Sequence, residues 1–320
     1  MKNKKKIFLA GHKGMVGSAL YKKLKETSNI IITKSKSNLD LTNEKKVINL
    51  FKKHDFDQVY ICAAKVGGIL ANKNNPVEFY TINQKIQLNI INSAFSSGVK
   101  NLIFLGSSCI YPSNLNNIKE NKLLSGYLDQ NNDAYALAKI TGIKLCDFYM
   151  RQYPKKKLKY ISLMPCNLFG PGDNFDEKNS HVLAAIIKKV YLAQKNQKKY
   201  ITLWGNGKPK REFMHVNEVA DACIYFMNIA SNKLKKYFNK QSHINIGYEK
   251  DISITSLAKT ISKIFEYSVK IKYDKSKPNG VFHKKLNTFE MKKLGFKPRR
   301  NFNNSLKDYI NQIKNKKKLI

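Results

Sequence analysis

The chain has 320 residues, of which 42% are hydrophobic, enough for a large buried core and about two domains of ordinary size. Its net charge of +37 points at first to nucleic-acid binding, yet only four of its 59 basic residues are arginines, whose planar fork suits phosphate. Because the lysines are scattered along the chain, we interpret the charge as a solvated surface and expect no nucleic-acid partner.

Short apolar runs alternate with helical patterns through the first half of the chain. The predicted strands cover residues 6–10, 30–33, 58–63, 101–106 and 160–165. The helical patterns between them cover residues 15–26, 44–53, 77–97 and 134–152. Strand–helix alternation at this spacing predicts an α/β fold, a Rossmann-type doubly wound parallel sheet.

The second half predicts a smaller domain that is interleaved with the first. Its predicted elements are helices over 181–195, 217–231 and 253–267, and a loop over 204–213. No tandem repeat or low-complexity linker divides the chain. We expect a sheet domain over 1–166, rejoined by 212–246, and a C-terminal domain formed by 167–211 and 247–320.

Cysteine use and hydropathy bear on the compartment. The chain has five cysteines, an odd number, and none forms a CxxC pair. This argues for the reducing cytoplasm and against a disulfide framework or a metal site. The start MKNKKKIFLAG is basic like a signal peptide, but its apolar stretch is too short. No run approaches the ~20 apolar residues of a membrane span, so we expect no membrane partner.

A glycine-rich loop follows the first predicted strand and opens the first predicted helix. It consists of Gly11, His12, Lys13, Gly14, Met15, Val16 and Gly17, with GxxGxxG spacing. Glycines there let the backbone turn tightly and approach a pyrophosphate, while the helix N-terminus supplies N–H donors. A plain tight turn fits the same residues, but their place between strand and helix favours a dinucleotide site.

The choice of cofactor depends on the end of the second strand, where an NAD site places a carboxylate for the ribose 2′-hydroxyl. Here the sequence reads TKSKS over 33–37 and has no acidic residue before Asp40. Lys34 and Lys36 suit a 2′-phosphate instead, so we predict NADP (NADPH). We also assign Asp40 and Leu41 to the cofactor site.

Tyr135 and Lys139 lie four residues apart in a predicted helix and therefore share one of its faces. A tyrosine titrates at about pH 10, and a neighbouring ammonium group is expected to lower that pKa. Ser107 follows a predicted central strand, where it could share a substrate oxygen with Tyr135. YxxxK alone is common by chance in lysine-rich helices, but with the glycine loop and Ser107 it favours an active site.

With these motifs the chain resembles the extended short-chain dehydrogenase/reductases, a family of nucleotide-sugar epimerases, dehydratases and reductases. Dehydratases of this family tend to carry a Thr-Asp-Glu triplet where this chain has Ser107-Ser108-Cys109, and 4-epimerases usually lack an ionisable side chain there. A cysteine at 109 with a histidine in NSHV (179–182) is similar to members that convert GDP-4-keto-6-deoxy-D-mannose to GDP-L-fucose.

The resemblance covers nearly the whole chain. The segments that carry it are 8–20, 63–72, 104–112, 135–146, 164–171, 179–182, 204–216, 242–247 and 276–280. It implies an NADP-dependent 3,5-epimerase-4-reductase that is a cytoplasmic homodimer, with NADP on the sheet domain and the nucleotide sugar on the C-terminal domain. The dimer interface would use helices 77–97 and 134–152, on which we expect exposed apolar residues: Ile82, Ile86, Ile90, Ile140 and Ile143.

In the mechanism of these relatives a cysteine removes a proton beside the C4 ketone and a histidine returns one on the opposite ring face. These roles map to Cys109 and His181, while Ser107 and Tyr135 would donate to the C4 oxygen. Cys109 also fits a small buried residue at a strand end, and His181 also fits the cap of a helix.

The resemblance implies binding residues as well. For the cofactor these are Leu105, Gly106, Ser107, Ser108, Lys139, Pro165, Cys166, Asn167, Leu168 and His181. For the nucleotide sugar they are Lys189, Trp204, Arg211 and Asn279. Two of them depart from the family pattern, because Asn279 replaces the aspartate of SKPDG and Cys166 replaces a threonine. We expect modest kinetic effects from both.

Two alternatives stay open. One is another nucleotide-sugar epimerase or reductase of the same family. The other is a non-catalytic relative that binds nucleic acid through its basic surface. The second has no need of the whole set of candidate catalytic residues, which is Ser107, Cys109, Tyr135, Lys139 and His181.

Overall fold

The computed structural model describes residues 4–113, 115–176, 180–238, 242–277 and 279–315. Its larger part contains β1 (Lys6–Ala10), α1 (Met15–Lys25), β2 (Ile30–Ile32), α2 (Glu44–Lys53), β3 (Gln58–Ile61), α3 (Ile69–Asn74), α4 (Pro76–Ser96), β4 (Asn101–Leu105), α5 (Asp133–Gln152), β5 (Lys159–Pro165), α7 (Val216–Asn228), α8 (Ser231–Phe238), β9 (Ile244–Ile246) and α10 (Phe289–Lys293). The smaller part contains β6 (Asn167–Phe169), α6 (Val182–Lys195), β7 (Tyr200–Trp204), β8 (Lys210–His215), β10 (Asp251–Ser253), α9 (Ile254–Ile264), β11 (Lys270–Asp274) and α11 (Phe302–Asn315).

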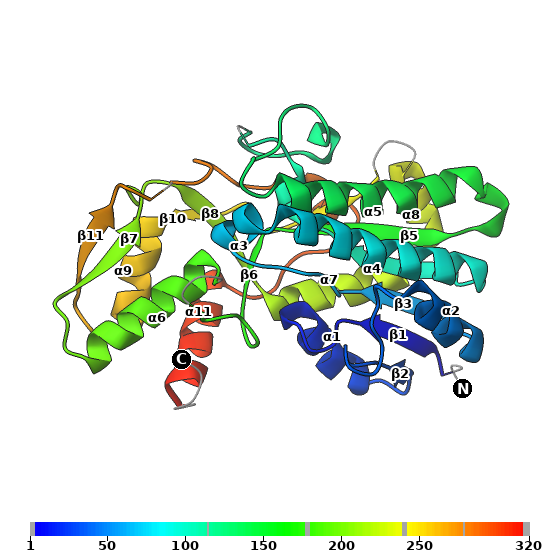
Figure 1. Ribbon diagram of the computed structural model, residues 1–320, viewed down its shortest axis with the longest axis horizontal. Helices are drawn as coiled ribbons and strands as arrows, with labels where there is room; N and C mark the ends of the chain where they lie inside the picture. Colours follow the sequence, from blue (N-terminus) through cyan, green and yellow to red (C-terminus); the bar gives the residue numbers. More distant parts are fainter. Residues whose placement is uncertain (1–3, 114, 177–179, 239–241, 278, 316–320) are drawn as a thin grey trace.

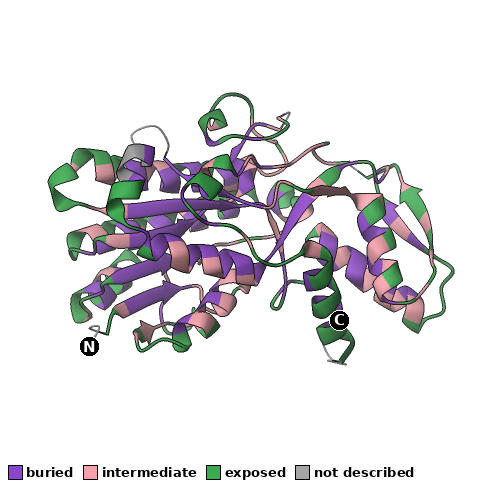
Figure 2. Ribbon diagram, turned by 180° about the vertical axis from the view of Figure 1, so that it is seen from behind, coloured by how far each residue is buried: buried purple, intermediate pink, exposed green. Residues whose placement is uncertain are grey.

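The larger part is built on a six-stranded sheet in the order β2-β1-β3-β4-β5-β9, with every neighbouring pair parallel. Its inner strands are buried along almost their whole length because helices cover both faces (Figures 1 and 2). Helix α4 packs against α2 and α5, and α1 packs against α7. This parallel sheet confirms the predicted α/β fold class.

The smaller part lies at one end of the molecule and has its own hydrophobic cluster (Figure 1). Strands β10, β8 and β6 form one sheet, and β11 pairs with β7. Helices α6, α9 and α11 pack their apolar faces against these strands. The predicted loop over 204–213 is wrong from Lys210 onward, because β8 begins there.

The path of the chain couples the two parts. Strand β6 begins two residues after β5 ends, β8 leads directly into α7, and β9 then returns to the large sheet. The carboxyl ends of the large sheet therefore face β6 and β8. Of the helices in the described part of the chain, none has the length and apolar character to cross a bilayer.

The expected exposure of the α4 and α5 isoleucines is wrong. Ile90 and Ile143 are fully buried, Ile86 and Ile140 are also buried, and Ile82 is half-buried. These side chains are covered because α4 and α5 pack against the sheet and against each other. The outer faces instead expose other apolar residues. These are Val77, Tyr80 and Leu88 on α4 and Leu137 and Phe148 on α5.

Candidate active site

The glycine loop lies at the carboxyl end of β1, beside β3, where the strand order of the sheet reverses. Gly11 has φ +86°, and a Cβ there would lie 2.5 Å from the Ala63 nitrogen. A Cβ on Gly17 would lie 2.0 Å from the Gly11 carbonyl oxygen. Gly14 is the N-cap of α1, so no side chain covers the N–H groups of its first turn. These residues have the close backbone packing and the free N–H groups that a dinucleotide pyrophosphate requires.

The side chains after β2 also fit an NADP site. Asp40 accepts hydrogen bonds from Thr42 N at 2.9 Å and Thr42 Oγ1 at 2.8 Å, and these bonds lower the pKa of Asp40. Its carboxylate is therefore engaged in its own turn. The charge of Lys36 acts on this carboxylate, and Lys34 and Lys36 are both exposed, with positive charge available for a 2′-phosphate.

Ser107 and Cys109 lie in the turn that follows β4. A Cβ on Gly106 would lie 2.3 Å from Met164 Sδ, so only glycine lets this end of β4 pack closely on β5. Cys109 N donates to Ser107 Oγ at 3.2 Å, and this bond caps a short 3₁₀ turn over Ser108–Ile110. The serine hydroxyl and the thiol are thus fixed side by side at the edge of the sheet.

Tyr135 and Lys139 reach the same place from the first turns of α5. The Lys139 ammonium donates to the Leu105 carbonyl at 2.7 Å and lies 5.8 Å from the centre of the Tyr135 ring. Burial lowers the pKa of Lys139 to about 8. Burial, with a smaller contribution from Cys109, raises the pKa of Tyr135, although a hydrogen bond with Ser107 opposes the change. The predicted lowering of this pKa is wrong, because the ammonium points at a carbonyl and burial disfavours the phenolate.

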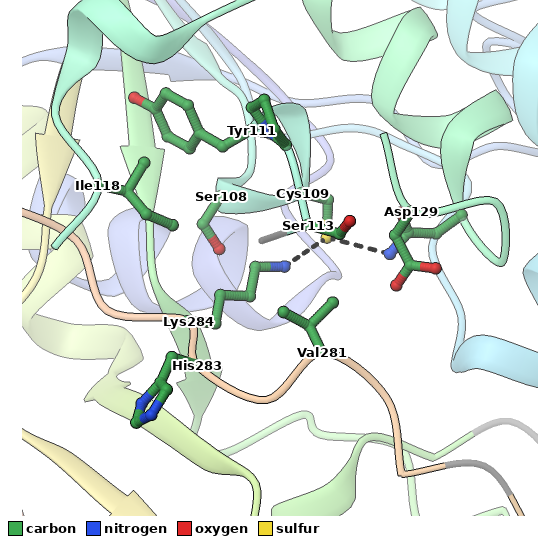
Figure 3. A pocket seen from close by; sticks show the side chains of 11 residues that line it. Ser108, Cys109, Tyr111, Ser113, Ile118, Asp129, Val281, His283 and Lys284 are labelled. Atoms are coloured by element: carbon green, nitrogen blue, oxygen red, sulfur yellow. Dashed lines mark hydrogen bonds between the residues drawn. The ribbon is translucent and has the colours of Figure 1, made fainter. Parts of the chain in front are cut away.

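Cys109 is half-buried, and two nitrogen atoms approach its sulfur (Figure 3). Lys284 Nζ lies 3.1 Å from Cys109 Sγ, and Asn132 Nδ2 lies 3.6 Å from it. Burial by itself would raise the pKa of Cys109, but the Lys284 charge and hydrogen bonds from Ser107 and Lys284 bring it below its ordinary value. By contrast, burial raises the pKa of Cys62 to about 12. Cys109 is therefore the thiol best placed to ionise.

His181 is the N-cap of α6, but its side chain makes no capping hydrogen bond to the described turn that follows. His181 as a residue is exposed to solvent. The surrounding protein nevertheless desolvates its imidazole, and this desolvation, followed by the charge of Lys284, lowers the pKa of His181. His181 thus lies within the electrostatic reach of the ammonium group that contacts Cys109. The first residue of the NSHV motif, 179, lies outside the described residues, as does residue 278 of SKPNG.

The residues assigned to the nicotinamide side follow β5. Pro165 ends β5, and Asn167 and Leu168 begin β6. Cys166 between them is buried, and burial followed by the charge of Glu212 raises its pKa well above the ordinary value. Its thiol stays protonated, as a weak replacement for a threonine hydroxyl.

Three of the four predicted sugar-nucleotide residues lie together in the smaller part. Asn279 Oδ1 accepts a hydrogen bond from Asn206 N at 2.8 Å. Asn206 lies two residues after Trp204, whose side chain is exposed. Arg211 Nη1 donates to Val281 O at 2.6 Å, and the charge of Cys109 acts on the Arg211 guanidinium. The fourth residue, Lys189 on α6, donates to the Thr202 carbonyl of the neighbouring strand at 2.7 Å.

The sequence model of the family described as "NAD dependent epimerase/dehydratase family" matches residues 7–247. The chain belongs to this family. A GDP-L-fucose synthase of Escherichia coli (strain K12) is 41% identical over 297 residues, which cover 92% of each chain. A solved GDP-mannoheptose C4 reductase from Campylobacter jejuni with NADP bound has TM-score 0.86 and 32% identity, covering 98% of this chain and 99% of that one. A GDP-L-fucose synthetase from Naegleria fowleri bound to NADP has TM-score 0.85 and 25% identity, covering 99% of this chain and 97% of that one.

Three side chains around Cys109 of this epimerase/dehydratase-family member escape prediction from the sequence: Lys284, Asn132 and Asp129. Asn132 and Asp129 precede α5 closely, so their proximity to Tyr135 gives a weak signal. Lys284 is separated from Cys109 by 175 residues and gives none.

Proposed function

We propose that this enzyme converts GDP-4-keto-6-deoxy-D-mannose to GDP-L-fucose by 3,5-epimerisation and NADPH-dependent 4-reduction, as a GDP-L-fucose synthase. The observation that carries the proposal is the thiol of Cys109, paired with a lysine ammonium and fixed beside Ser107 and Tyr135. A C4 reductase needs the phenol and the hydroxyl but has no use for an ionised thiol. The relatives named GDP-L-fucose synthase support the same reaction.

Epimerisation uses the acidity of the hydrogens beside the C4 ketone. The Cys109 thiolate takes the proton from C3, so that the C–H bond breaks, an S–H bond forms and the electron pair moves toward the C4 oxygen as an enolate. Ser107 and Tyr135 donate hydrogen bonds to that oxygen. His181 gives a proton to the other face of the carbon. The thiol then loses its proton to solvent and the imidazole takes one up, so that the same exchange can follow at C5.

Reduction uses the same oxygen site. NADPH, when bound along the Gly11–Gly17 loop, supplies the hydride for C4. Tyr135 then gives its hydroxyl proton to the C4 oxygen, a role that suits a phenol whose raised pKa keeps it protonated at neutral pH. Lys139 holds the Leu105 carbonyl beside it. We assign the sugar nucleotide to Lys189, Trp204, Arg211 and Asn279, with the guanidinium facing the pyrophosphate.

A product assay tests this function. GDP-4-keto-6-deoxy-D-mannose is incubated with the enzyme and NADPH, and the sugar nucleotide formed is identified by NMR. GDP-L-fucose is the expected product. A C4-reduced sugar with unchanged configuration at C3 and C5 would establish the alternative, a GDP-sugar reductase like the C. jejuni relative.

Lys36→Ala tests the proposed cofactor preference. Loss of one charge-assisted contact to the 2′-phosphate, worth roughly 1.5–3 kcal/mol, should raise the KM for NADPH about 10- to 100-fold. The KM for NADH, which lacks this phosphate, should stay unchanged. Lys45→Ala, an exposed lysine on α2, is the matched control. Equal effects of Lys36→Ala on both cofactors would contradict the assignment.

We also propose a cytoplasmic homodimer that pairs the outer faces of α4 and α5. Leu88 and Leu137 are exposed there, near the hydrogen bond from Thr141 Oγ1 to Gln84 Oε1 at 2.9 Å that joins the two helices. Light scattering at micromolar concentration should give twice the mass of one chain, and Leu88→Asp with Leu137→Asp should give the monomer. A monomeric wild type would contradict the proposal.

A further inference from the structure

A strap of chain from Val281 to Thr288 crosses the site and carries Lys284 to the sulfur of Cys109. Lys284 Nζ contacts the sulfur at 3.1 Å (Figure 3), and Asn132 Nδ2 lies 3.6 Å from the same sulfur. Lys284 is half-buried. The contact joins the C-terminal segment of the chain to the turn after β4.

The strap is held through its backbone on both sides of Lys284. Lys210 N donates to Phe282 O at 2.9 Å, and Leu286 N donates to Glu212 Oε2 at 3.0 Å. Ile118 N donates to Lys285 O at 2.9 Å. Because these bonds fix the backbone, the lysine side chain needs little reorganisation to contact the sulfur.

Glu212 anchors this strap from the interior. Its carboxylate is fully buried and accepts backbone hydrogen bonds from Tyr248, Glu249 and Leu286. Burial of a carboxylate costs free energy, and the three backbone donors offset part of that cost while they join the segments that carry them. Here it fixes the strap that presents Lys284 relative to β8, which carries Arg211.

The charges that face the thiol are of both signs. Lys284 and Arg211 are positive, whereas Asp129 is negative and opposes ionisation, and the neutral Tyr135 phenol completes the set. Of the two cations, Lys284 is the one in hydrogen-bond contact with the sulfur. Its charge also acts on His181, where it adds to the effect of burial in lowering the pKa of the imidazole.

We propose that Lys284 is the positioning residue that keeps Cys109 as a thiolate and so makes it a base for epimerisation. This inference rests on the proposed function. The lysine gives up no proton in the step. Its ammonium pairs with the thiolate before the C–H bond breaks, and the hydrogen bond passes to the neutral thiol afterwards.

Alkylation of Cys109 by iodoacetamide, followed against pH by peptide mass spectrometry, tests the pairing without substrate. Lys284→Met should move the midpoint about 1–2 pH units upward, because an adjacent opposite charge shifts a pKa by roughly that amount. At pH 7 the exchange of C3 and C5 hydrogens with heavy water should then fall about 10- to 100-fold and recover as the pH rises. Lys284→Arg keeps the charge and should largely restore both.

The controls separate charge from folding. Lys285→Met removes an equal charge from the next residue of the strap and should leave the midpoint unchanged, and Lys284→Gln replaces Lys284→Met if that variant fails to fold. The inference is overturned if the midpoint is unchanged in Lys284→Met or Lys284→Gln, or if the midpoint of Lys284→Arg is as high as in those two variants. If the midpoint moves but the wild type exchanges no C3 or C5 hydrogen, the proposed function fails while the pairing stands.

Discussion

Cys109→Ser should slow the exchange of C3 and C5 hydrogens by roughly 10²- to 10⁴-fold, the usual contribution of one general base. A serine hydroxyl occupies nearly the same volume but does not ionise near neutral pH, even beside Lys284 at the 3.1 Å that separates its ammonium from the native sulfur. NMR of GDP-4-keto-6-deoxy-D-mannose in heavy water measures the exchange at each carbon.

The same variant separates the two halves of the reaction. Oxidation of GDP-L-fucose by NADP reverses the C4 step alone and should persist far better in Cys109→Ser than the exchange does. Cys62→Ser is the matched control, since burial raises the pKa of that thiol to about 12 and excludes it as a base at neutral pH. Exchange at the wild-type rate in Cys109→Ser would remove the assignment of the base.

The sequence predicts those parts of the molecule that depend on short-range pattern. Strand–helix alternation sets the parallel sheet, and the carboxyl ends of its strands bring the Gly11 loop and Ser107 to one edge. Tyr135 and Lys139 reach the same edge because they lie one helical turn apart. Each of these inferences needs only the local register of side chains.

The rest depends on long-range packing. Lys284 is one lysine among many, and only the fold of the strap brings it to Cys109. Turn residues around Gly205 and Gly207 mask the start of β8, which is stabilised by its pairing with β6 and β10. The direction of the Tyr135 pKa follows from burial, which YxxxK spacing does not reveal.

Tyr135→Phe should impair both halves of the reaction, unlike Cys109→Ser. Loss of the proton donor should slow reduction at C4 by roughly 10²- to 10⁴-fold. Loss of one hydrogen-bond donor to the enolate oxygen should slow C3 and C5 exchange by about 10²- to 10³-fold. NADPH consumption and heavy-water exchange, each with the same keto sugar, measure the two effects.

The wild-type pH profile adds a test of the role of the phenol. Because burial raises the pKa of Tyr135, the hydroxyl stays protonated across the neutral range, and reduction should not accelerate as the pH rises toward the ordinary tyrosine value. Tyr127→Phe, at a tyrosine that is 94% exposed, is the matched control for removal of a phenol oxygen. If Tyr135→Phe slows reduction but leaves exchange untouched, the two chemistries do not share one oxyanion site, and the enolate must be stabilised by Ser107 alone.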